Sequence, residues 1–315
     1  MISGRVIRNT GSSYVVKTNQ GEEFPCRIKG NFRLKGIRTT NPVAVGDLVK
    51  ISHASDDAYY IKEIEPRKNY IIRRASNLSK ESHILAANID QAILVASIFN
   101  PETPTTFIDR FLATSEAYSV PAIILLNKCD LWTPEIQGYA LEMKQLYEGI
   151  GYPVYFSSAY NGIGIEELKT LLKNKISLFA GNSGVGKSSL INALIPGINL
   201  RTGDVSDLHH TGTHTTTFSE MIPLPEGGEL IDIPGVKGFG MIEFRKEEVG
   251  HYFPEIFKKS GECKYGDCRH LGEPGCAVEK AVVDGEISPT RFASYLSIME
   301  EVSGETGDDK YRKPF

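Results

Sequence analysis

The chain has 315 residues, of which 41% are hydrophobic and 23% are charged, a composition typical of soluble globular proteins with two or three domains. No apolar run reaches the roughly 18 residues that a membrane-spanning helix needs, and the first residues lack a signal-peptide core, so we expect a cytoplasmic protein. The net charge of −4 conceals an asymmetry, because residues 1–74 contain 14 Lys and Arg against 7 Asp and Glu. This basic part is either a contact for phosphates or a solvated surface.

Residues 1–70 consist of short runs in which apolar and polar residues alternate, separated by turn signals such as "NQGEE" at 19–23. The pattern predicts about five strands of a small antiparallel barrel or sandwich. With its basic charge this favours an OB-fold, which commonly binds oligonucleotides, although other small barrels share the alternation. Five basic residues crowd around Phe32 in one predicted loop, and we expect them to contact RNA: Arg27, Lys29, Arg33, Lys35 and Arg38.

A second region, residues 71–244, begins within a bridging segment, "EPRKNYIIRRAS" at 65–76. Continuous apolar runs such as "QAILVASIF" at 91–99 indicate buried parallel strands, and stretches such as "FIDRFLATSEAY" at 107–118 have helical periodicity. Strands that alternate with helices predict a doubly wound α/β domain.

A phosphate loop follows one of these predicted strands and precedes a predicted helix. It reads G-N-S-G-V-G-K-S over 181–188, and its glycines allow backbone N–H groups to surround the phosphates of a nucleotide. We expect Lys187 to neutralise the β- and γ-phosphates and Ser188 to bind Mg²⁺. The predicted nucleotide contacts of this segment are Gly181, Asn182, Ser183, Gly184, Val185, Gly186, Lys187, Ser188 and Ser189.

Two base-reading motifs lie upstream of the phosphate loop, each at the end of a predicted strand. In "NKCD" at 127–130, Asp130 can accept hydrogen bonds from N1 and the exocyclic amino group of guanine, a pair of donors that adenine lacks. We expect Asn127 to contact N7 and the stem of Lys128 to pack over the base. The second motif has the pattern of the loop whose backbone reads the guanine O6, and it consists of Ser157, Ser158 and Ala159.

Two further parts follow the phosphate loop, a Thr-rich switch at 211–217 and "DIPG" at 232–235. Asp232 is expected to reach Mg²⁺ through water, and Gly235 to offer its N–H to the γ-phosphate. All the parts of a guanine-nucleotide switch are therefore present, but in a rotated order. A sheet tolerates such a rearrangement because its termini can be rejoined at a surface loop, so we predict a circularly permuted P-loop GTPase domain.

The third region, residues 245–315, reads as short helices around a cysteine cluster and ends in a basic tail. Cys263, Cys268, His270 and Cys276 could form a closed, structural Cys₃His zinc site. Reduced cysteines beside a packing histidine are the alternative interpretation. Cys26 and Cys129 fall in predicted strands and are expected to be small core residues.

On these motifs the chain resembles the ribosome small-subunit-dependent GTPases (RsgA, also called YjeQ or YloQ), over essentially its whole length. The segments that carry the resemblance are "NKCD", "GNSGVGKSSLINAL", "GTHTTT", "DIPGVKGFG" and "CKYGDCRHLGEPGC". The resemblance implies an OB-fold, a permuted GTPase domain and a mainly helical zinc-binding domain. It also implies GTP hydrolysis stimulated by the small (30S) ribosomal subunit, late maturation of that subunit and contact with its 16S rRNA.

The hydrolytic groups do not follow the Ras-type pattern, because Val236 stands where Ras-type enzymes have a water-orienting Gln. The resemblance implies a histidine in the Thr-rich switch, and His214 could orient water there. Capping of the loop or contact with RNA is the alternative role. Thr215 and Thr216 are expected to reach Mg²⁺ and the γ-phosphate, with their order unassigned.

Three classes of function fit these features to different degrees. The leading hypothesis is a monomeric GTPase whose nucleotide state times its binding to ribosomal RNA. A non-enzymatic RNA-binding factor with GTP as a structural ligand is the second, and intact Lys187, Ser188 and Asp232 oppose it. An ATP-dependent phosphotransferase is the third, and Asp130 opposes it because adenine would leave the carboxylate unpaired.

Overall fold

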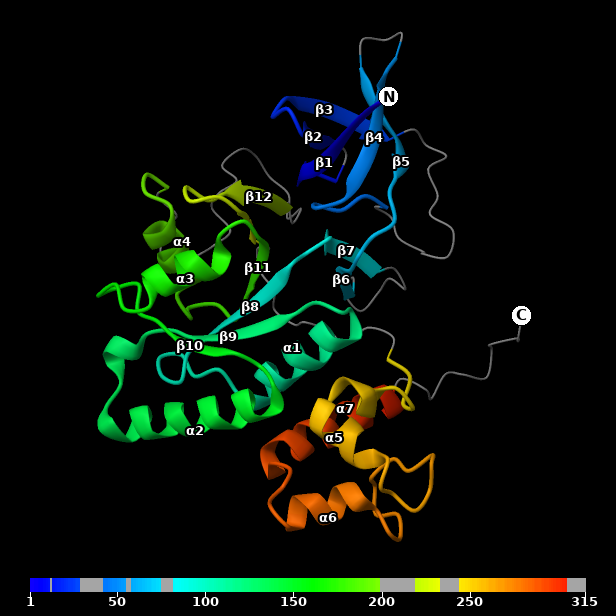
Figure 1. Cartoon of the computed structure of the whole chain (residues 1–315), viewed down its shortest axis with the longest axis vertical. Coiled ribbons are helices and arrows are strands. Elements are labelled where there is room, and N and C mark those ends of the chain that lie inside the picture. The colour runs from blue at the N-terminus through cyan, green and yellow to red at the C-terminus, as the bar shows by residue number, and fades with distance from the viewer. Residues whose placement is uncertain are drawn as a thin grey trace, which may run out of the picture.

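The computed structural model describes residues 1–11, 13–28, 42–54, 58–74, 82–198, 219–232 and 244–304. Three parts follow one another along its long axis: a small β structure, a sheet covered by helices, and a helical unit (Figure 1). His214, Thr215, Thr216, Gly235, Lys29, Arg33, Lys35 and Arg38 lie outside the described residues. The predicted boundaries at 70 and 244 stay predictions.

The first part is a five-stranded barrel, as predicted, but β3 and β5 pair in parallel and not antiparallel. Its strands pair in the order β1-β2-β3-β5-β4, and β1 also pairs with β4, which closes the sheet on itself. Alternate residues point inward, so Val6, Val16 and Ile51 fill a core that excludes water. The strands are β1 (Ile2–Asn9), β2 (Tyr14–Thr18), β3 (Glu23–Ile28), β4 (Leu48–His53) and β5 (Tyr59–Ile64).

The central part is a sheet in the order β10-β9-β8-β11-β13-β12, parallel except for β12. Its strands are β8 (Gln91–Ala96), β9 (Ala122–Leu126), β10 (Val154–Phe156), β11 (Ile176–Ala180), β12 (Ser219–Pro223) and β13 (Glu229–Asp232). The helices are α1 (Thr105–Ala117), α2 (Pro134–Ile150), α3 (Ile165–Leu172) and α4 (Lys187–Leu194). This is the predicted α/β domain.

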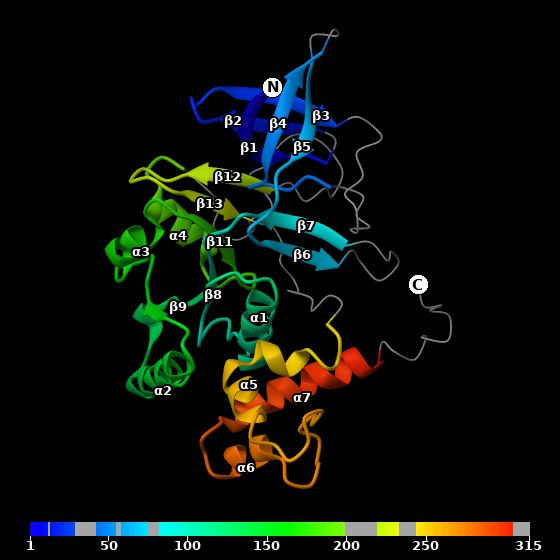
Figure 2. The same ribbon diagram turned by 45° about the vertical axis from the view of Figure 1, so that its right-hand side comes forward.

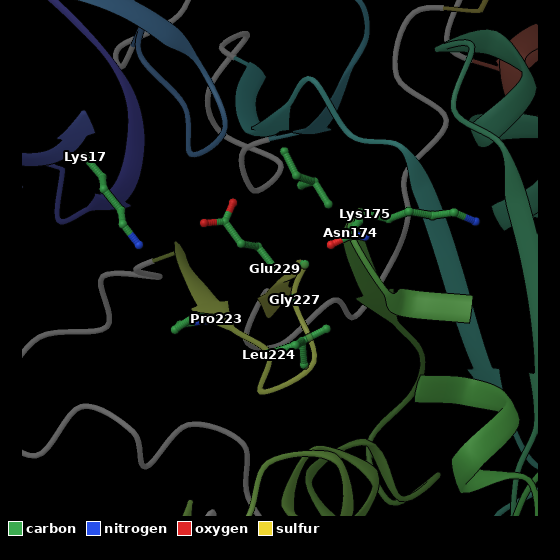
Figure 3. A pocket seen from close by; sticks show the side chains of 9 residues that line it. Lys17, Asn174, Lys175, Pro223, Leu224, Gly227 and Glu229 are labelled. Atoms are coloured by element: carbon green, nitrogen blue, oxygen red, sulfur yellow. The ribbon is translucent and has the colours of Figure 1, made fainter. Parts of the chain in front are cut away.

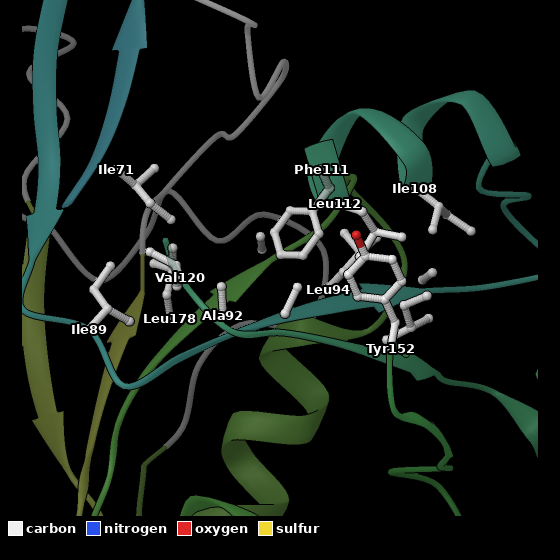
Figure 4. Close-up of a cluster of buried hydrophobic side chains, with 14 of the residues drawn as sticks. Ile71, Ile89, Ala92, Leu94, Ile108, Phe111, Leu112, Val120, Tyr152 and Leu178 are labelled. Carbon is white, nitrogen blue, oxygen red and sulfur yellow. The ribbon is translucent and has the colours of Figure 1, made fainter. Parts of the chain in front are cut away.

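Both faces of the central sheet are buried, which explains why its strands read as continuous apolar runs. Leu94 of β8 points to the face covered by α1 and α2, where it joins a cluster with Phe111 and Tyr152 (Figure 4). Its neighbours Ile93 and Val95 point to the opposite face and join the cluster under α3 and α4. Alternation within one strand therefore supplies two cores.

The barrel and the central sheet are continuous. β1 pairs antiparallel with β12, with Arg8 opposite Glu220, so that one sheet of eleven strands runs through both parts (Figure 2). The barrel also lies against the backbone of Ala87, at Gly46. Gly46 has a φ of +93°, and an added Cβ there would lie 2.0 Å from the carbonyl oxygen of Ala87. Only glycine fits this crossing of two backbones.

Two sequence predictions need correction here. The segment interpreted as a bridge contains β6 (Tyr70–Arg74), which pairs antiparallel with β7 (Ser82–Ala87) in a separate two-stranded sheet. Cys129 is not in a strand but in the 3₁₀ helix η1 (Cys129–Leu131), half-buried, because the chain turns directly after β9. Cys26 is a buried residue of β3, as predicted.

The C-terminal unit, residues 244–304, is helical. It comprises η3 (Val249–Tyr252), α5 (Pro254–Ser260), α6 (Ala277–Val283) and α7 (Pro289–Gly304), around a core that includes Phe253 and Tyr295. No helix among the described residues combines the length and the apolar character needed to cross a membrane.

A buried ion pair joins the C-terminal unit to the central domain. Arg291 of α7, 0% exposed, donates through one nitrogen to Asp109 of α1 at 2.9 Å and through two others to Glu255 of α5. The hydroxyl of Tyr147 on α2 also donates to Asp109, at 2.9 Å. Because loss of either partner would leave a buried charge unpaired, these contacts specify how α1, α2, α5 and α7 meet.

Candidate nucleotide-binding site and metal centre

The phosphate loop connects β11 to α4, as the sequence predicts. Gly181, Gly184 and Gly186 have φ values of +146°, +80° and +98°, and an added Cβ at Gly181 would lie 2.2 Å from the carbonyl oxygen of Val95. Val185 fixes the loop to the hydrophobic core, because its side chain is fully buried in the same cluster as Leu190. The glycines are required by backbone conformation and close approach.

The charged groups of this loop are arranged for an anion. The ammonium of Lys187 donates to the carbonyls of Gly181 and Asn182, both at 2.7 Å, so it lies over the loop. Ser188 is buried in the first turn of α4, where the helix dipole favours negative charge. Lys187 and Ser188 therefore occupy the positions from which they could contact phosphate and a divalent cation.

The two base-reading motifs and the phosphate loop are bonded to one another. The Nδ2 of Asn127 donates to the carbonyl of Val185 at 2.9 Å, and the hydroxyl of Ser157 donates to the Oδ1 of Asn127 at 3.0 Å. An added Cβ at Gly186 would lie 2.3 Å from that Nδ2. Asn127 thus joins all three loops, a role that the sequence analysis missed, while its contact with N7 stays a prediction.

Asp130 has the exposure that base recognition requires. The residue is exposed, and its Oδ1 accepts a hydrogen bond from the hydroxyl of Ser158, which is fully buried. One carboxylate oxygen is therefore fixed by the second base-reading loop. The backbone N–H of Tyr160, beyond Ala159, donates to the hydroxyl of Ser158 at 3.2 Å. The carboxylate and the second loop are consequently positioned as one unit.

The remaining predicted site residues are only partly described. Asp232 is the last residue of β13. It pairs with Phe179, which is one residue before the end of β11. Arg27 is an exposed residue of β3. A groove of about 410 Å³ lies elsewhere, at the opposite edge of the sheet, where Lys17 of the barrel and Glu229 point toward each other (Figure 3). It is not part of the nucleotide site.

The cysteine cluster forms a compact donor set. The ligand atoms of Cys263, Cys268, His270 and Cys276 all lie within 4.8 Å of one another, with His270 Nδ1 at 3.3 Å from Cys276 Sγ. Tetrahedral zinc with bonds of about 2.0–2.3 Å spaces its ligands by roughly 3.5 Å, so these residues could hold a metal such as zinc. Burial lowers the pKa of His270, which favours the neutral imidazole that binds metal.

Comparison with known proteins agrees with this geometry. A family model described as RsgA GTPase matches residues 64–242, and one described as RsgA N-terminal domain matches residues 3–61. The chain belongs to the RsgA GTPase family.

Relatives match over the whole length. Proteins named "Small ribosomal subunit biogenesis GTPase RsgA" are 55% identical in Bacteroides fragilis, over 100% of both chains, and 57% identical in Porphyromonas gingivalis strain ATCC 33277, over 98% of this chain and 100% of the relative. The crystal structure of YjeQ from Thermotoga maritima is 35% identical with a TM-score of 0.77, covering 96% of this chain and 99% of that one. YloQ, "a circularly permuted GTPase", is 31% identical with a TM-score of 0.73, covering 100% and 97%. The predicted family, fold class and GTPase activity are confirmed.

The bonds of Ser157 generate a test of how the loops act together. Ser157→Ala removes the donor to Asn127, and we expect GDP to bind about fivefold more weakly, because a net hydrogen bond contributes about 1 kcal/mol. Titration calorimetry measures the change. Ser115→Ala is the matched control, since Ser115 is equally buried but bonds within α1 to Phe111. Equal affinity of Ser157→Ala and wild type would contradict this role of the hydroxyl.

Proposed function

We propose that this chain hydrolyses GTP as an assembly factor in late maturation of the small ribosomal subunit, binding ribosomal RNA and working faster on the subunit than alone. The observation that carries the nucleotide part is that Asn127 bonds both the phosphate loop and Ser157, while Ser158 bonds Asp130. The names of full-length relatives, "Small ribosomal subunit biogenesis GTPase RsgA", support the ribosomal part. We further propose a cytoplasmic monomer.

In this proposal guanine binds against Asp130 and the backbone after Ser158, with the stem of Lys128 over its face. The backbone of 182–187 and the ammonium of Lys187 bind the β- and γ-phosphates. Ser188, Thr215 and Thr216, together with Asp232 through water, would hold Mg²⁺, and the ion would supply positive charge beside the phosphate oxygens. Gly235 donates its N–H to the γ-phosphate.

Water activation falls to the Thr-rich switch, because Val236 offers no polar group. His214 orients the attacking water in this proposal, although it lies outside the described residues. A chain without the water-orienting Gln is expected to be slow alone. Contact with the subunit, through Arg27 and the basic loop that contains Lys29, Arg33, Lys35 and Arg38, completes the site.

The decisive measurement is phosphate release from GTP and from ATP, with and without purified small ribosomal subunits. We expect GTP-specific turnover that rises at least about tenfold with subunits, since a partner that completes a GTPase site with a charge-stabilising arginine raises turnover by several orders of magnitude in other GTPases. GTP binding without turnover in either condition would instead make GTP a structural ligand. Turnover of ATP at an equal rate would contradict the role of Asp130.

We also propose that Cys263, Cys268, His270 and Cys276 bind one zinc ion that stabilises the C-terminal unit. Burial raises the pKa of Cys268 to about 12 when no cation is considered, so thiolates at neutral pH need a cation to stabilise them. A unit of this size has a small core of its own, which makes a structural metal effective.

Metal analysis tests the zinc proposal. Cys268→Ser should lower zinc from about one ion per chain to none, and lower the unfolding temperature, because the metal binds the folded unit only. Cys129→Ser, a half-buried cysteine outside the cluster, is the control and should keep both values. A full zinc content in Cys268→Ser would contradict the assignment.

A further inference from the structure

A loop that none of the nucleotide motifs includes lies between the two nucleotide-contacting segments. Residues 97–104 connect β8 to α1 at the same edge of the sheet as the phosphate loop. They are here called the third loop, counted after the phosphate loop and the base-reading loop of Asn127 to Asp130. The loop is closed on itself, because Thr103 Oγ1 accepts from the N–H of Ser97 at 3.0 Å and Ser97 Oγ donates to the carbonyl of Phe99 at 2.6 Å. Ser97 and Thr103 are buried, so its base is fixed.

The tip of the third loop contacts both nucleotide loops. The ammonium of Lys128 donates to the carbonyl of Asn100. An added Cβ at Gly184 of the phosphate loop would lie 3.3 Å from Cδ of Pro101. Lys128 also passes close to Gly186, where an added Cβ would lie 3.9 Å from its Cε. The Lys128 side chain therefore extends from the base-reading loop along the phosphate loop to this tip.

The contact with Asn100 restrains the group that is expected to pack over the base. A lysine side chain has four rotatable bonds, and their freedom opposes any binding that must order them. Because the carbonyl of Asn100 holds the ammonium, the stem is ordered before a nucleotide arrives. Such preorganisation increases affinity without a new contact to the ligand.

The other end of the third loop is attached to the C-terminal unit. The loop leads directly into α1, whose Asp109 binds Arg291 of α7, and the next residue, Arg110, pairs with Glu301 of α7 at 2.6 Å. Two side-chain contacts of α1 therefore join the helix that follows the third loop to α7.

We propose that residues 97–104 are a third positioning loop of the nucleotide site, through which the placement of the C-terminal unit on α1 sets the affinity for guanine nucleotide. The inference rests on the proposed GTP site. Binding of the C-terminal unit to a partner then changes how tightly the nucleotide is held.

The first arm of the test measures dissociation of a fluorescent GDP analogue from the full chain. Pro101→Ala should release it about fivefold faster than wild type, and Lys128→Met about tenfold faster. The double variant should be no faster than Lys128→Met alone, because both changes remove the same ordering of the Lys128 side chain by the third loop. KM for GTP should rise in Pro101→Ala while kcat changes less than about twofold, as expected for a loss of uniform binding. Pro121→Ala is the control, because Pro121 is an exposed proline directly before the first residue of β9, at the end of that strand away from the nucleotide loops.

The second arm tests transmission from the C-terminal unit. Arg110→Ala and Glu301→Ala break a partly exposed pair, so both chains should fold, and each should release the analogue about two to three times faster, with no further change in the double variant. Lys259→Ala is the matched control, because Lys259 pairs with Glu262 and Glu286 within the C-terminal unit.

The outcomes separate the inference from the proposed function. Release at the wild-type rate from Pro101→Ala, or additive effects of Pro101→Ala and Lys128→Met, would overturn the third loop as a positioning element. An unchanged rate in Arg110→Ala and Glu301→Ala would overturn the transmission. If the wild-type chain bound no guanine nucleotide at all, the proposed function itself would fail.

Discussion

The parallel pairing of β9, β8, β11 and β13 is the constraint on which the site depends. Parallel strands all end at one edge, so the loops after them meet there whatever their order along the chain. Asn127 after β9 can then bond Val185 after β11, although 58 residues separate them. The absence of a side chain at Gly186 allows this approach. Circular permutation leaves the site intact because spatial adjacency, not sequence order, defines it.

The permuted order changes what the site is attached to. β12 joins the central sheet to β1 of the barrel, and Arg291 joins α1 to the C-terminal unit. The barrel is therefore bonded to β12, which pairs with β13, and the C-terminal unit is bonded to α1, which follows the third loop. Under the proposed function, binding of the barrel or of the C-terminal unit to the ribosomal subunit and the nucleotide state would then be parts of one equilibrium.

Local chemistry made much of the molecule predictable from sequence. The phosphate loop needs glycines, buried strands need continuous apolar runs, and a zinc site needs Cys and His, so each left a pattern in consecutive residues. The joining contacts left none. Arg291 reads as an ordinary exposed residue of a helix, and its burial follows only from Asp109 and Glu255, which are distant in sequence. The pairing of β1 with β12 and the contact of Asn100 with Lys128 are long-range in the same way.

The central claim, that Asp130 selects guanine, is tested most directly by changing residue 130 and the base of the nucleotide together. In the proposed complex the carboxylate would accept from the N1–H and the amino group of guanine, whereas xanthine has a carbonyl in place of that amino group and needs a donor. Calorimetric titration of wild type and Asp130→Asn with GDP and xanthosine diphosphate is the measurement. The account predicts that wild type prefers GDP and that Asp130→Asn reverses the preference. Unchanged preference for GDP in Asp130→Asn would contradict it.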